Sequence, residues 1–225
     1  MTAHASDYAW LETEEFAPIL EAYCLTMVEA TSGGELLRRF GAAPGRPVTG
    51  VEQVLAAWER YEDGDDGDGD DEDGDGDDGD EALRGREDEE LMVVAVAELD
   101  GWAVALEVNG YLGSMWGLLP GLAEGTRLVS HFRNVNAVDH FHWQEGERNR
   151  LHFEPLFPAE RDGSDADAVA ELLAGVGFDL GTAEDRAIDR TTTAAFALGE
   201  ELTGLRLTPE WLRTAEFVIG YAPQP

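Results

Sequence analysis

Three short segments in the middle of the chain alternate apolar and polar side chains, and they constrain the fold more than any other feature. A period of two with aromatic side chains on one side is typical of half-buried β-strands. Asn134-Val135-Asn136 and Glu145-Gly146-Glu147 separate the segments and supply turn residues, because Asn and Gly tolerate positive φ. The pattern predicts three consecutive antiparallel strands, at residues 127–133, 137–143 and 149–155.

The polar side of these strands is expected to hold most of the histidines of the chain together with several arginines. Four of the five histidines lie between residues 126 and 152, with four arginines against three acidic residues, whereas the whole chain has a formal net charge of −33. If each strand alternates strictly, one face holds the aromatic side chains. The opposite face is then expected to hold His131, His140, His142, His152, Arg127, Arg133 and Arg150.

This polar face is the candidate binding site. We predict that ligand or partner binding involves Arg133, Asn134, Asn136, Asp139, His140, His142, Arg150 and His152. In the turn, Arg133 and the two Asn amides would present directional donors to an anionic or polar ligand, or to a partner chain. The alternative is purely structural, because Asn commonly forms hairpin turns and Asp139 can bond backbone amides. No residue is predicted to be catalytic.

The histidine spacing also bears on metal binding. His140 and His142 project to the same side of a strand and His152 falls on the next strand, an arrangement that can bind zinc. No cysteine accompanies them, and Arg133 and Arg150 on the same face would repel a cation. We therefore predict no bound metal and no cofactor, and we expect the histidines to be solvated or to face a partner.

The chain offers little for covalent catalysis. It contains no lysine, which excludes Schiff-base chemistry and a P-loop. Ser130 adjoins His131, but neighbours on a strand point to opposite faces and cannot form a nucleophile–base pair. The single cysteine, Cys24, lies among apolar residues, where a buried and inert thiol is expected.

The flanking sequence predicts an α+β fold. Residues 91–98 and 102–108 are predicted strands joined by Asp100-Gly101, a strong hairpin signal. Helices are predicted at 33–40, 50–60 and 165–174, from Thr182 onward and after Thr208-Pro209, and residues 217–221 are a further candidate strand. A helix is also favoured at residues 16–28, although residues 23–28 fit a strand as well. The expected architecture is an antiparallel sheet of about five strands in a meander, packed with helices from both chain ends, in a single domain over residues 1–225.

A low-complexity acidic loop at residues 61–88 interrupts this predicted domain. Residues 62–81 hold fourteen acidic residues and no basic one, so they repel one another and cannot bury a core. We expect a disordered insertion. Asp71, Asp73, Asp75 and Gly76 match the start of an EF-hand loop, but Ala82 stands where the bidentate Glu is required. Weak association of divalent cations is therefore expected here, and not a specific calcium site.

The acidity of the chain limits its partners. Nucleic acid is not expected as a partner, because phosphate binding needs a dominant basic surface. A basic protein is the partner that the charge favours, through electrostatic steering. No apolar run approaches the roughly 20 residues that cross a bilayer, and no signal-peptide pattern opens the chain. We expect no membrane association and a cytoplasmic location, which also suits the single cysteine.

Several phrases of the sequence resemble one protein family. SHFRNVNAVDHFHW, VNGYLGS before it, FEPLFP after it and LTGLRLTPE near the end are similar to an actinobacterial, largely streptomycete family of uncharacterised proteins with a domain of unknown function. The similarity covers nearly all of the chain except the acidic run. The family has no assigned activity to carry over. The resemblance also implies that the histidine run is not a family feature, so His140 and His142 are poor candidates for a shared catalytic role.

Together these observations predict a non-catalytic binding or interaction protein that covers a basic protein partner. The alternative is a small-molecule or metal-dependent enzyme that uses the Arg/His face of the sheet.

Overall fold

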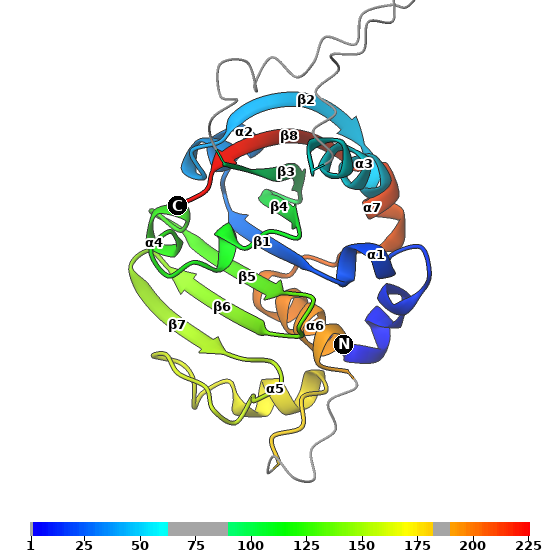
Figure 1. The fold of residues 1–225 in the computed structure, drawn as a ribbon. Helices are drawn as coiled ribbons and strands as arrows, with labels where there is room; N and C mark the ends of the chain where they lie inside the picture. Colours follow the sequence, from blue (N-terminus) through cyan, green and yellow to red (C-terminus); the bar gives the residue numbers. More distant parts are fainter. Residues whose placement is uncertain (1, 63–89, 182–189) are drawn as a thin grey trace, which may run out of the picture.

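The computed structural model describes residues 2–62, 90–181 and 190–225. Within them the strands form one eight-stranded antiparallel sheet in the order β2-β8-β3-β4-β1-β5-β6-β7 (Figure 1). The strands are β1 (Tyr23–Glu29), β2 (Ala43–Thr49), β3 (Leu91–Leu99), β4 (Trp102–Val108), β5 (Arg127–Arg133), β6 (Asp139–Glu145), β7 (Arg148–Phe153) and β8 (Glu216–Pro223). The predicted α+β class and antiparallel sheet are confirmed, but the sheet has eight strands and not about five.

Helical segments cover both faces of this sheet. They are the 3-10 helices η1 (Ala5–Glu12) and η3 (Leu112–Ser114), with α1 (Ala17–Leu20), α2 (Gly33–Arg39), α3 (Gly50–Glu62), α4 (Leu119–Leu122), α5 (Ala170–Val176), α6 (Thr191–Thr203) and α7 (Pro209–Thr214). On one face η1, α3, α5, α6 and α7 contribute to a large hydrophobic core, here called the major core. On the other face α2, η3 and α4 contribute to a smaller one, the minor core. Among the described helices, none combines the length and the apolar composition that a bilayer crossing requires.

The central strands are buried on both faces. All residues of β4 are buried. Val104 and Leu106 face the major core, whereas Ala103 and Ala105 face the minor core. A strand that is covered on both sides carries a continuous apolar run instead of a clean alternation.

The burial of both faces of the sheet explains why the helix favoured at residues 16–28 is wrong over most of its length. Residues 16–28 are predicted to be helical, but the helix there is limited to α1, and β1 begins at Tyr23. Within β1, Met27 faces the major core and Val28 the minor core. Because both neighbours are apolar, the period of two disappears, and such a run cannot be told from a buried helix by its pattern.

Two more of the eight strands, β2 and β8, lie at the edge of the sheet opposite β7. β2 carries Pro44 and Pro47. Proline has no backbone N–H to donate to a neighbouring strand, so within a sheet it is tolerated at an edge strand. The prolines also make this segment resemble a loop in the sequence. β8, the candidate strand at residues 217–221, is confirmed and lies between β2 and β3.

The predicted helices at residues 33–40 and 50–60 are confirmed as α2 and α3, and the helix after Thr208-Pro209 as α7. Side-chain caps fix two of them: the hydroxyl of Ser32 accepts from the Glu35 amide at 3.2 Å, and that of Thr208 from the Trp211 amide at 3.1 Å.

The remaining predictions about helices and loops are met in part. The helix predicted at residues 165–174 starts later, at Ala170. The cap predicted at Thr182 lies outside the described residues. So does the acidic loop predicted at residues 61–88, apart from its first two residues, which belong to α3.

Candidate functional site

Three imidazole rings lie together on the minor-core side of β5, β6 and β7, where His140 and His152 are partly exposed and His142 is buried. The strand register places His142 opposite His152 on β7 and opposite Ser130 on β5, and it places His140 opposite Phe132. These side chains therefore share one face. We call His140, His142 and His152 the histidine cluster.

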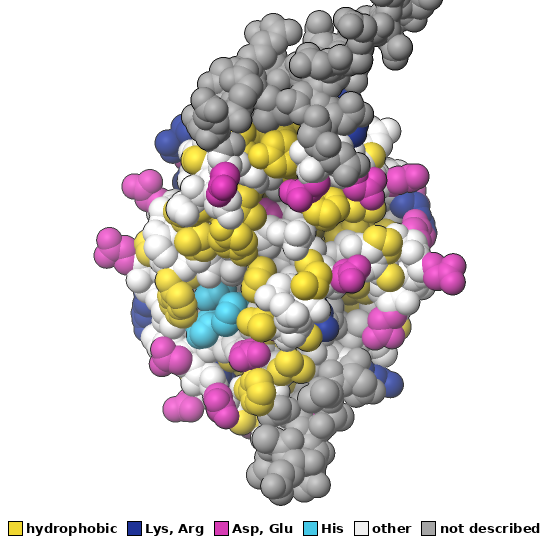
Figure 2. All heavy atoms as spheres, in the orientation of Figure 1, with side chains coloured by type: hydrophobic (Ala, Val, Ile, Leu, Met, Phe, Trp, Pro, Cys, Tyr) yellow, Lys and Arg dark blue, Asp and Glu magenta, His cyan; other side chains and the backbone are white. Residues whose placement is uncertain are grey.

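The three imidazole rings of the histidine cluster lie against one another. Their centroids are separated by 4.7 Å for His142 and His152, 5.6 Å for His140 and His152, and 6.1 Å for His140 and His142. Figure 2 shows histidine side chains at the surface in this region, bordered by apolar side chains. Sequence reasoning predicted this convergence of the three rings on one face.

Trp116 completes the surface, and sequence reasoning missed it. It lies between η3 and α4, and its ring packs edge-on against His142 at 5.0 Å and His152 at 4.7 Å between centroids. Its side chain is nevertheless 53% exposed. Trp116 therefore contacts the histidine cluster while about half of its surface stays exposed.

Several ring nitrogens of the histidine cluster have no hydrogen-bond partner within the described residues. They are Nδ1 of His140, Nδ1 and Nε2 of His142, and Nε2 of His152. Burial lowers the pKa of His142 and, less strongly, that of His152, so both rings are held neutral. A buried polar group without a partner costs about 1–3 kcal/mol. Four of the six ring nitrogens in the cluster are thus buried without a partner among the described residues.

A second polar group lies deeper on the same face. Glu107 is fully buried, and its carboxylate accepts from the backbone amides of Leu112 at 2.7 Å and Gly113 at 2.9 Å. Burial raises the pKa of Glu107 to about 7. The carboxylate therefore fastens η3 onto the sheet.

Cys24 lies beside this carboxylate, and its thiol is 3.5 Å from the Ser130 hydroxyl. Burial raises the pKa of the Cys24 thiol well above its usual range, which keeps it protonated and inert. The hydrogen bonds of Ser130 that the structure describes go to Cys24 and Thr26 and not to a histidine. This group provides no activated nucleophile.

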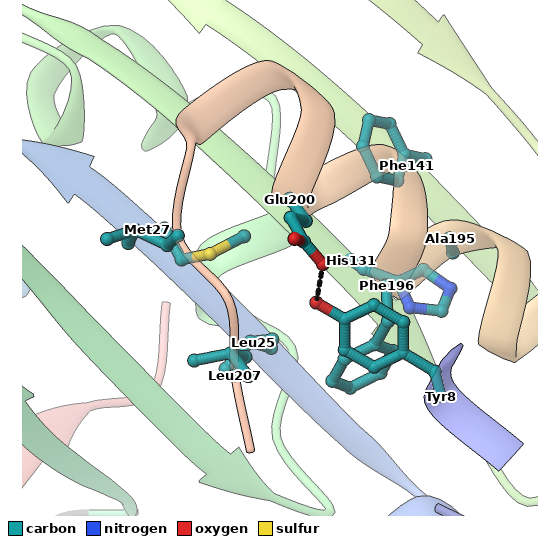
Figure 3. A pocket seen from close by; sticks show the side chains of 10 residues that line it. Tyr8, Leu25, Met27, His131, Phe141, Ala195, Phe196, Glu200 and Leu207 are labelled. Carbon is teal, nitrogen blue, oxygen red and sulfur yellow. Dashed lines mark hydrogen bonds between the residues drawn. The ribbon is translucent and has the colours of Figure 1, made fainter. Parts of the chain in front are cut away.

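His131 does not lie with the histidine cluster, so the prediction that four histidines share one face is wrong. It pairs with Phe141 and Leu25 and faces the major core, where Nδ1 lies 2.7 Å from the Tyr23 hydroxyl. A cavity of about 10 Å³ adjoins it, which is room for a single water molecule at most. Figure 3 shows the side chains around this cavity, including Tyr8, whose hydroxyl donates to Glu200 at 2.9 Å.

The burial of His131 predicts an acid-sensitive fold. Burial lowers its pKa from 6.5 to about 3, so the unfolded chain binds a proton more tightly than the folded chain. The contribution of this group to stability is complete above pH 6.5 and is lost as the pH falls toward 3. We expect urea unfolding to show a smaller loss of stability between pH 7 and pH 4.5 in His131→Gln than in the wild type. Glu107 and Asp139, whose raised pKa values act in the opposite direction, are common to both proteins and cancel in this comparison. Equal losses would contradict the assignment.

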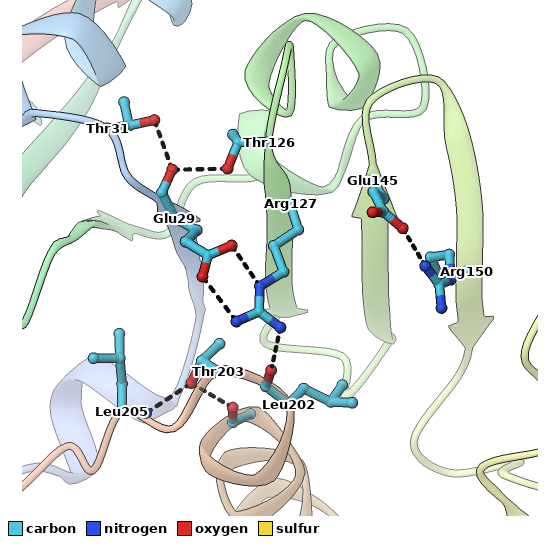
Figure 4. A network of polar contacts seen from close by, with 10 residues as sticks. Glu29, Thr31, Thr126, Arg127, Glu145, Arg150, Leu202, Thr203 and Leu205 are labelled. Atoms are coloured by element: carbon cyan, nitrogen blue, oxygen red, sulfur yellow. Dashed lines mark hydrogen bonds and ion pairs between the residues drawn. The ribbon is translucent and has the colours of Figure 1, made fainter.

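The predicted arginines also lie away from the cluster. Arg127 donates to the Glu29 carboxylate at 2.7 and 2.9 Å and to the Leu202 carbonyl at 3.2 Å, which ties β5 to β1 and to the end of α6 (Figure 4). Arg150 pairs with Asp165 and Glu145, and its guanidinium stacks 4.6 Å from the centroid of Trp143. The predicted combination of arginines and histidines on one face is therefore wrong.

The turn after β5 follows the structural alternative. The side-chain oxygen of Asn134 accepts from the backbone amides of Asn136 at 2.9 Å and Val138 at 3.0 Å. Ala137 takes a positive φ of 57°, and β6 starts at Asp139 instead of residue 137. Asn134 thus shapes the turn, while Asn136 is exposed at its tip.

Arg133 closes this hairpin through an ion pair with Asp139. Its guanidinium is 3.0 Å from the carboxylate, which is fully buried, and Arg133 itself is 25% exposed. Burial raises the pKa of Asp139 to about 6, although Arg133 opposes that shift. Both residues were predicted to bind a ligand, and in the structure they bind each other.

The family model described as "Family of unknown function (DUF6461)" matches residues 1–225. The chain belongs to the DUF6461 family. No curated protein and no solved structure matches it. The family carries no assigned activity, so any function must be argued from the residues of the site.

For this DUF6461 chain, Arg133→Ala is expected to lower the free energy of unfolding by about 1–3 kcal/mol at pH 8, because it leaves the Asp139 carboxylate buried without its cation. The loss should be smaller at pH 5, where Asp139 is largely protonated. Arg38→Ala is the matched control: Arg38 pairs with Glu35 but is 68% exposed, and its removal should change stability by less than about 0.5 kcal/mol. Chemical denaturation at both pH values measures the difference. A loss that does not depend on pH would contradict the role given to Asp139.

Proposed function

We propose that this DUF6461 protein is a non-catalytic binding protein, and that its binding surface is the histidine cluster together with Trp116. One observation carries the proposal. The partly exposed imidazoles of His140 and His152 and the buried imidazole of His142 lie beside a half-exposed tryptophan, and four of their ring nitrogens are buried without a hydrogen-bond partner among the described residues. An imidazole nitrogen can accept a hydrogen bond, and the tryptophan ring offers a flat apolar contact, so the surface suits a ligand that supplies donors.

Binding fits the site better than catalysis. The enzyme alternative used arginines and histidines from a single face, but in the structure Arg133 and Arg150 are ion-paired away from the cluster. The Cys24 thiol is buried and protonated. Among the described residues near the cluster, no nucleophile is hydrogen-bonded to a histidine that would act as its base.

The partner we propose is a basic protein. A formal net charge of −33 would steer such a partner toward the chain and discourage acidic ones. An arginine of the partner could stack on Trp116 in a cation–π contact and donate to the histidine cluster. We place this interaction in the cytoplasm of an actinobacterium, because the chain has one cysteine, no lysine and abundant alanine and glycine.

Co-purification at two salt concentrations tests the proposal. The tagged wild type and the variant Trp116→Ala/His152→Ala are incubated with lysate of the native host. We expect a basic protein to be retained by the wild type at low salt, to be released as ionic strength rises, and to be retained poorly by the variant. Val135→Ala is the control, because Val135 is also an exposed apolar residue, at 64%, but lies in the β5–β6 turn. Retention that the double variant does not change would contradict the proposed surface.

A further inference from the structure

We infer that residues 115–118, which carry Trp116, form an acid-released cover over the histidine cluster. The cover is closed at neutral pH, and it opens when His142 and His152 take up protons. This inference goes beyond the proposed partner binding and does not depend on it, because it concerns a movement of the free chain.

The closed cover leaves His142 with no means of holding a charge. The residue is 1% exposed, and neither of its ring nitrogens has a hydrogen-bond partner among the described residues. Protonation would make both nitrogens donors without acceptors and would bury an unpaired cation, which is a very costly arrangement in a protein. Proton uptake by His142 therefore requires that water reach the ring.

The neighbouring imidazoles add repulsion to this cost. The ring of His152 is stacked on that of His142 at 4.7 Å between centroids, with an angle of 27° between the ring planes. The ring of His140 lies 6.1 Å from that of His142. Two cations this close in a poorly solvated site repel each other strongly. The cluster therefore gains positive charge only if its rings separate or water enters.

Trp116 is the part of the cover that can yield. Its ring lies edge-on against His142 and His152, at 5.0 and 4.7 Å between centroids, while 53% of the residue is exposed. Among the described residues, no backbone hydrogen bond involves Trp116 or Gly117. A Cβ atom at Gly117 would meet nothing within 4 Å, so the chain has room to move there. The ring contacts are thus what holds Trp116 against the sheet.

The direction of the pH effect follows from the burial of the two rings. Burial, and then the nearby imidazoles, lower the pKa of His142 well below 6.5, and burial lowers that of His152 although Asp162 opposes the shift. In the open form both rings titrate as exposed histidines do, with a pKa of about 6.5. The closed form is therefore fully stabilised above pH 6.5, and it loses that stability as the pH falls toward the lower pKa values of the closed form. Each histidine changes the ratio of closed to open form by up to about tenfold per pH unit.

The other ionisable groups around the cluster leave this direction unchanged. The helices packed on it, η3 and α4, carry no ionisable side chain. The remaining groups are His140 on β6, Asp162 bridged to β7, Glu154 after β7, and, on the major-core side of the same strands, His131, Arg133 and Asp139. Arg133 and Arg150 are ion-paired with Asp139 and Asp165. No cation here is relieved by the closed form, and the carboxyl of Asp162 does not reverse the lowering at His152.

Glu107 limits the movement to residues 115–118. This carboxyl is buried beneath η3, where it accepts hydrogen bonds from the backbone amides of Leu112 and Gly113. Burial raises its pKa from 4.5 to about 7, so a movement that uncovered Glu107 would become harder as the pH falls below 7. The Cys24 thiol beside it stays protonated and adds no charge. Acid thus holds η3 on the sheet while it releases Trp116.

Nuclear magnetic resonance of the free, full-length chain tests the inference. The nuclear Overhauser contacts between the ring of Trp116 and those of His142 and His152 are followed from pH 7.5 to pH 5.0. We expect these contacts at pH 7.5 and their progressive loss below pH 6.5, because the ratio of closed to open form falls by about tenfold or more per pH unit. The backbone amide signals of Leu112 and Gly113 should stay in place, since η3 does not move.

Trp10 is the internal control of the same experiment. Its ring packs edge-on against Phe16 at 5.0 Å between centroids, in η1 and the segment after it. The contact between these two rings should persist to pH 5.0, because no histidine of the cluster takes part in it.

The variant His142→Phe/His152→Phe separates charge from packing. Phenylalanine keeps an aromatic ring at each position but takes up no proton, so the contacts of both rings with Trp116 should persist to pH 5.0. If this variant does not fold by circular dichroism, the wild type decides the matter. In the wild type, the loss of the Trp116 contacts and the protonation of His142 should share one midpoint.

Three results would overturn the inference: Trp116 contacts that do not change down to pH 5.0, an equal loss of contacts in the folded double variant, or separate midpoints for contact loss and protonation in the wild type. Loss of the contact between Trp10 and Phe16 at the same pH would indicate general unfolding and would also overturn it. Because the free chain is measured, the result stands whether or not a basic protein is retained at this surface.

Discussion

Replacing Phe141 with alanine is expected to lower the free energy of unfolding by about 3–5 kcal/mol. Phe141 lies on β6 between two cluster residues, but it points the other way, into the major core, and it is 0% exposed. Its ring packs on Phe153 at 5.4 Å and on His131 at 6.2 Å between centroids. Truncation removes a buried aromatic side chain and leaves a cavity among residues of three neighbouring strands, which cannot all relax.

Urea denaturation of the wild type and the variant measures this loss. Val135→Ala serves as the control on the same hairpin, because Val135 is 64% exposed and should change stability by less than about 0.5 kcal/mol. A loss below about 1 kcal/mol for Phe141→Ala would mean that β6 does not bury this face, and it would remove the basis for the outward direction of His140 and His142.

Strands β5, β6 and β7 could be predicted from the sequence for a physical reason. β5, β6 and β7 form a meander in which each turn carries its own local signal, such as the side-chain oxygen of Asn134 or the positive φ of Gly146. Strands joined by short turns depend on neighbours in the sequence, so local patterns are sufficient to predict them. β1 depends on β4 and β5, which lie far along the chain, and its apolar run gives no local signal of that pairing.

The grouping of His140, His142 and His152 could be predicted, but the position of His131 could not, because β5 has no single apolar face. β5 carries apolar residues on both faces, with Leu128 in the minor core and Val129 in the major core. Alternation alone could not decide which face of this strand His131 shared with the other histidines. On β6, Phe141 is flanked by His140 and His142, so the faces were unambiguous there.

Trp116 could not be placed at the site from the sequence pattern, whereas Glu107 could have been singled out. Trp116 reaches the histidine cluster because the chain between η3 and α4 folds back over the sheet, a long-range event. Glu107 is a lone carboxylate in a strand of otherwise apolar residues, and that irregularity was a usable signal. A charge in a fully buried strand requires partners, and the η3 amides provide them.

Gly113→Ala is expected to lower the free energy of unfolding by about 2–4 kcal/mol. A Cβ atom at this position would overlap the Thr26 hydroxyl oxygen, and it would lie 3.0 Å from Glu107 Oε1 and 3.1 Å from Cys24 Sγ. All three neighbours belong to central strands and are fully buried, so none can move aside cheaply. η3 must lift from the sheet instead, which stretches the hydrogen bond from the Gly113 amide to Glu107.

Gly117→Ala is the matched control for this substitution. Gly117 lies four residues along the same connection, and a Cβ there would meet nothing within 4 Å. Thermal and urea unfolding should therefore place Gly117→Ala close to the wild type and Gly113→Ala well below it. Because Trp116 lies two residues after the end of η3, the lifting of η3 should also expose His142. Gly113→Ala should therefore increase the reactivity of the cluster histidines toward diethyl pyrocarbonate. If Gly113→Ala were as stable as Gly117→Ala, η3 would not be seated on Glu107, and the position of Trp116 over the histidine cluster would lose its support.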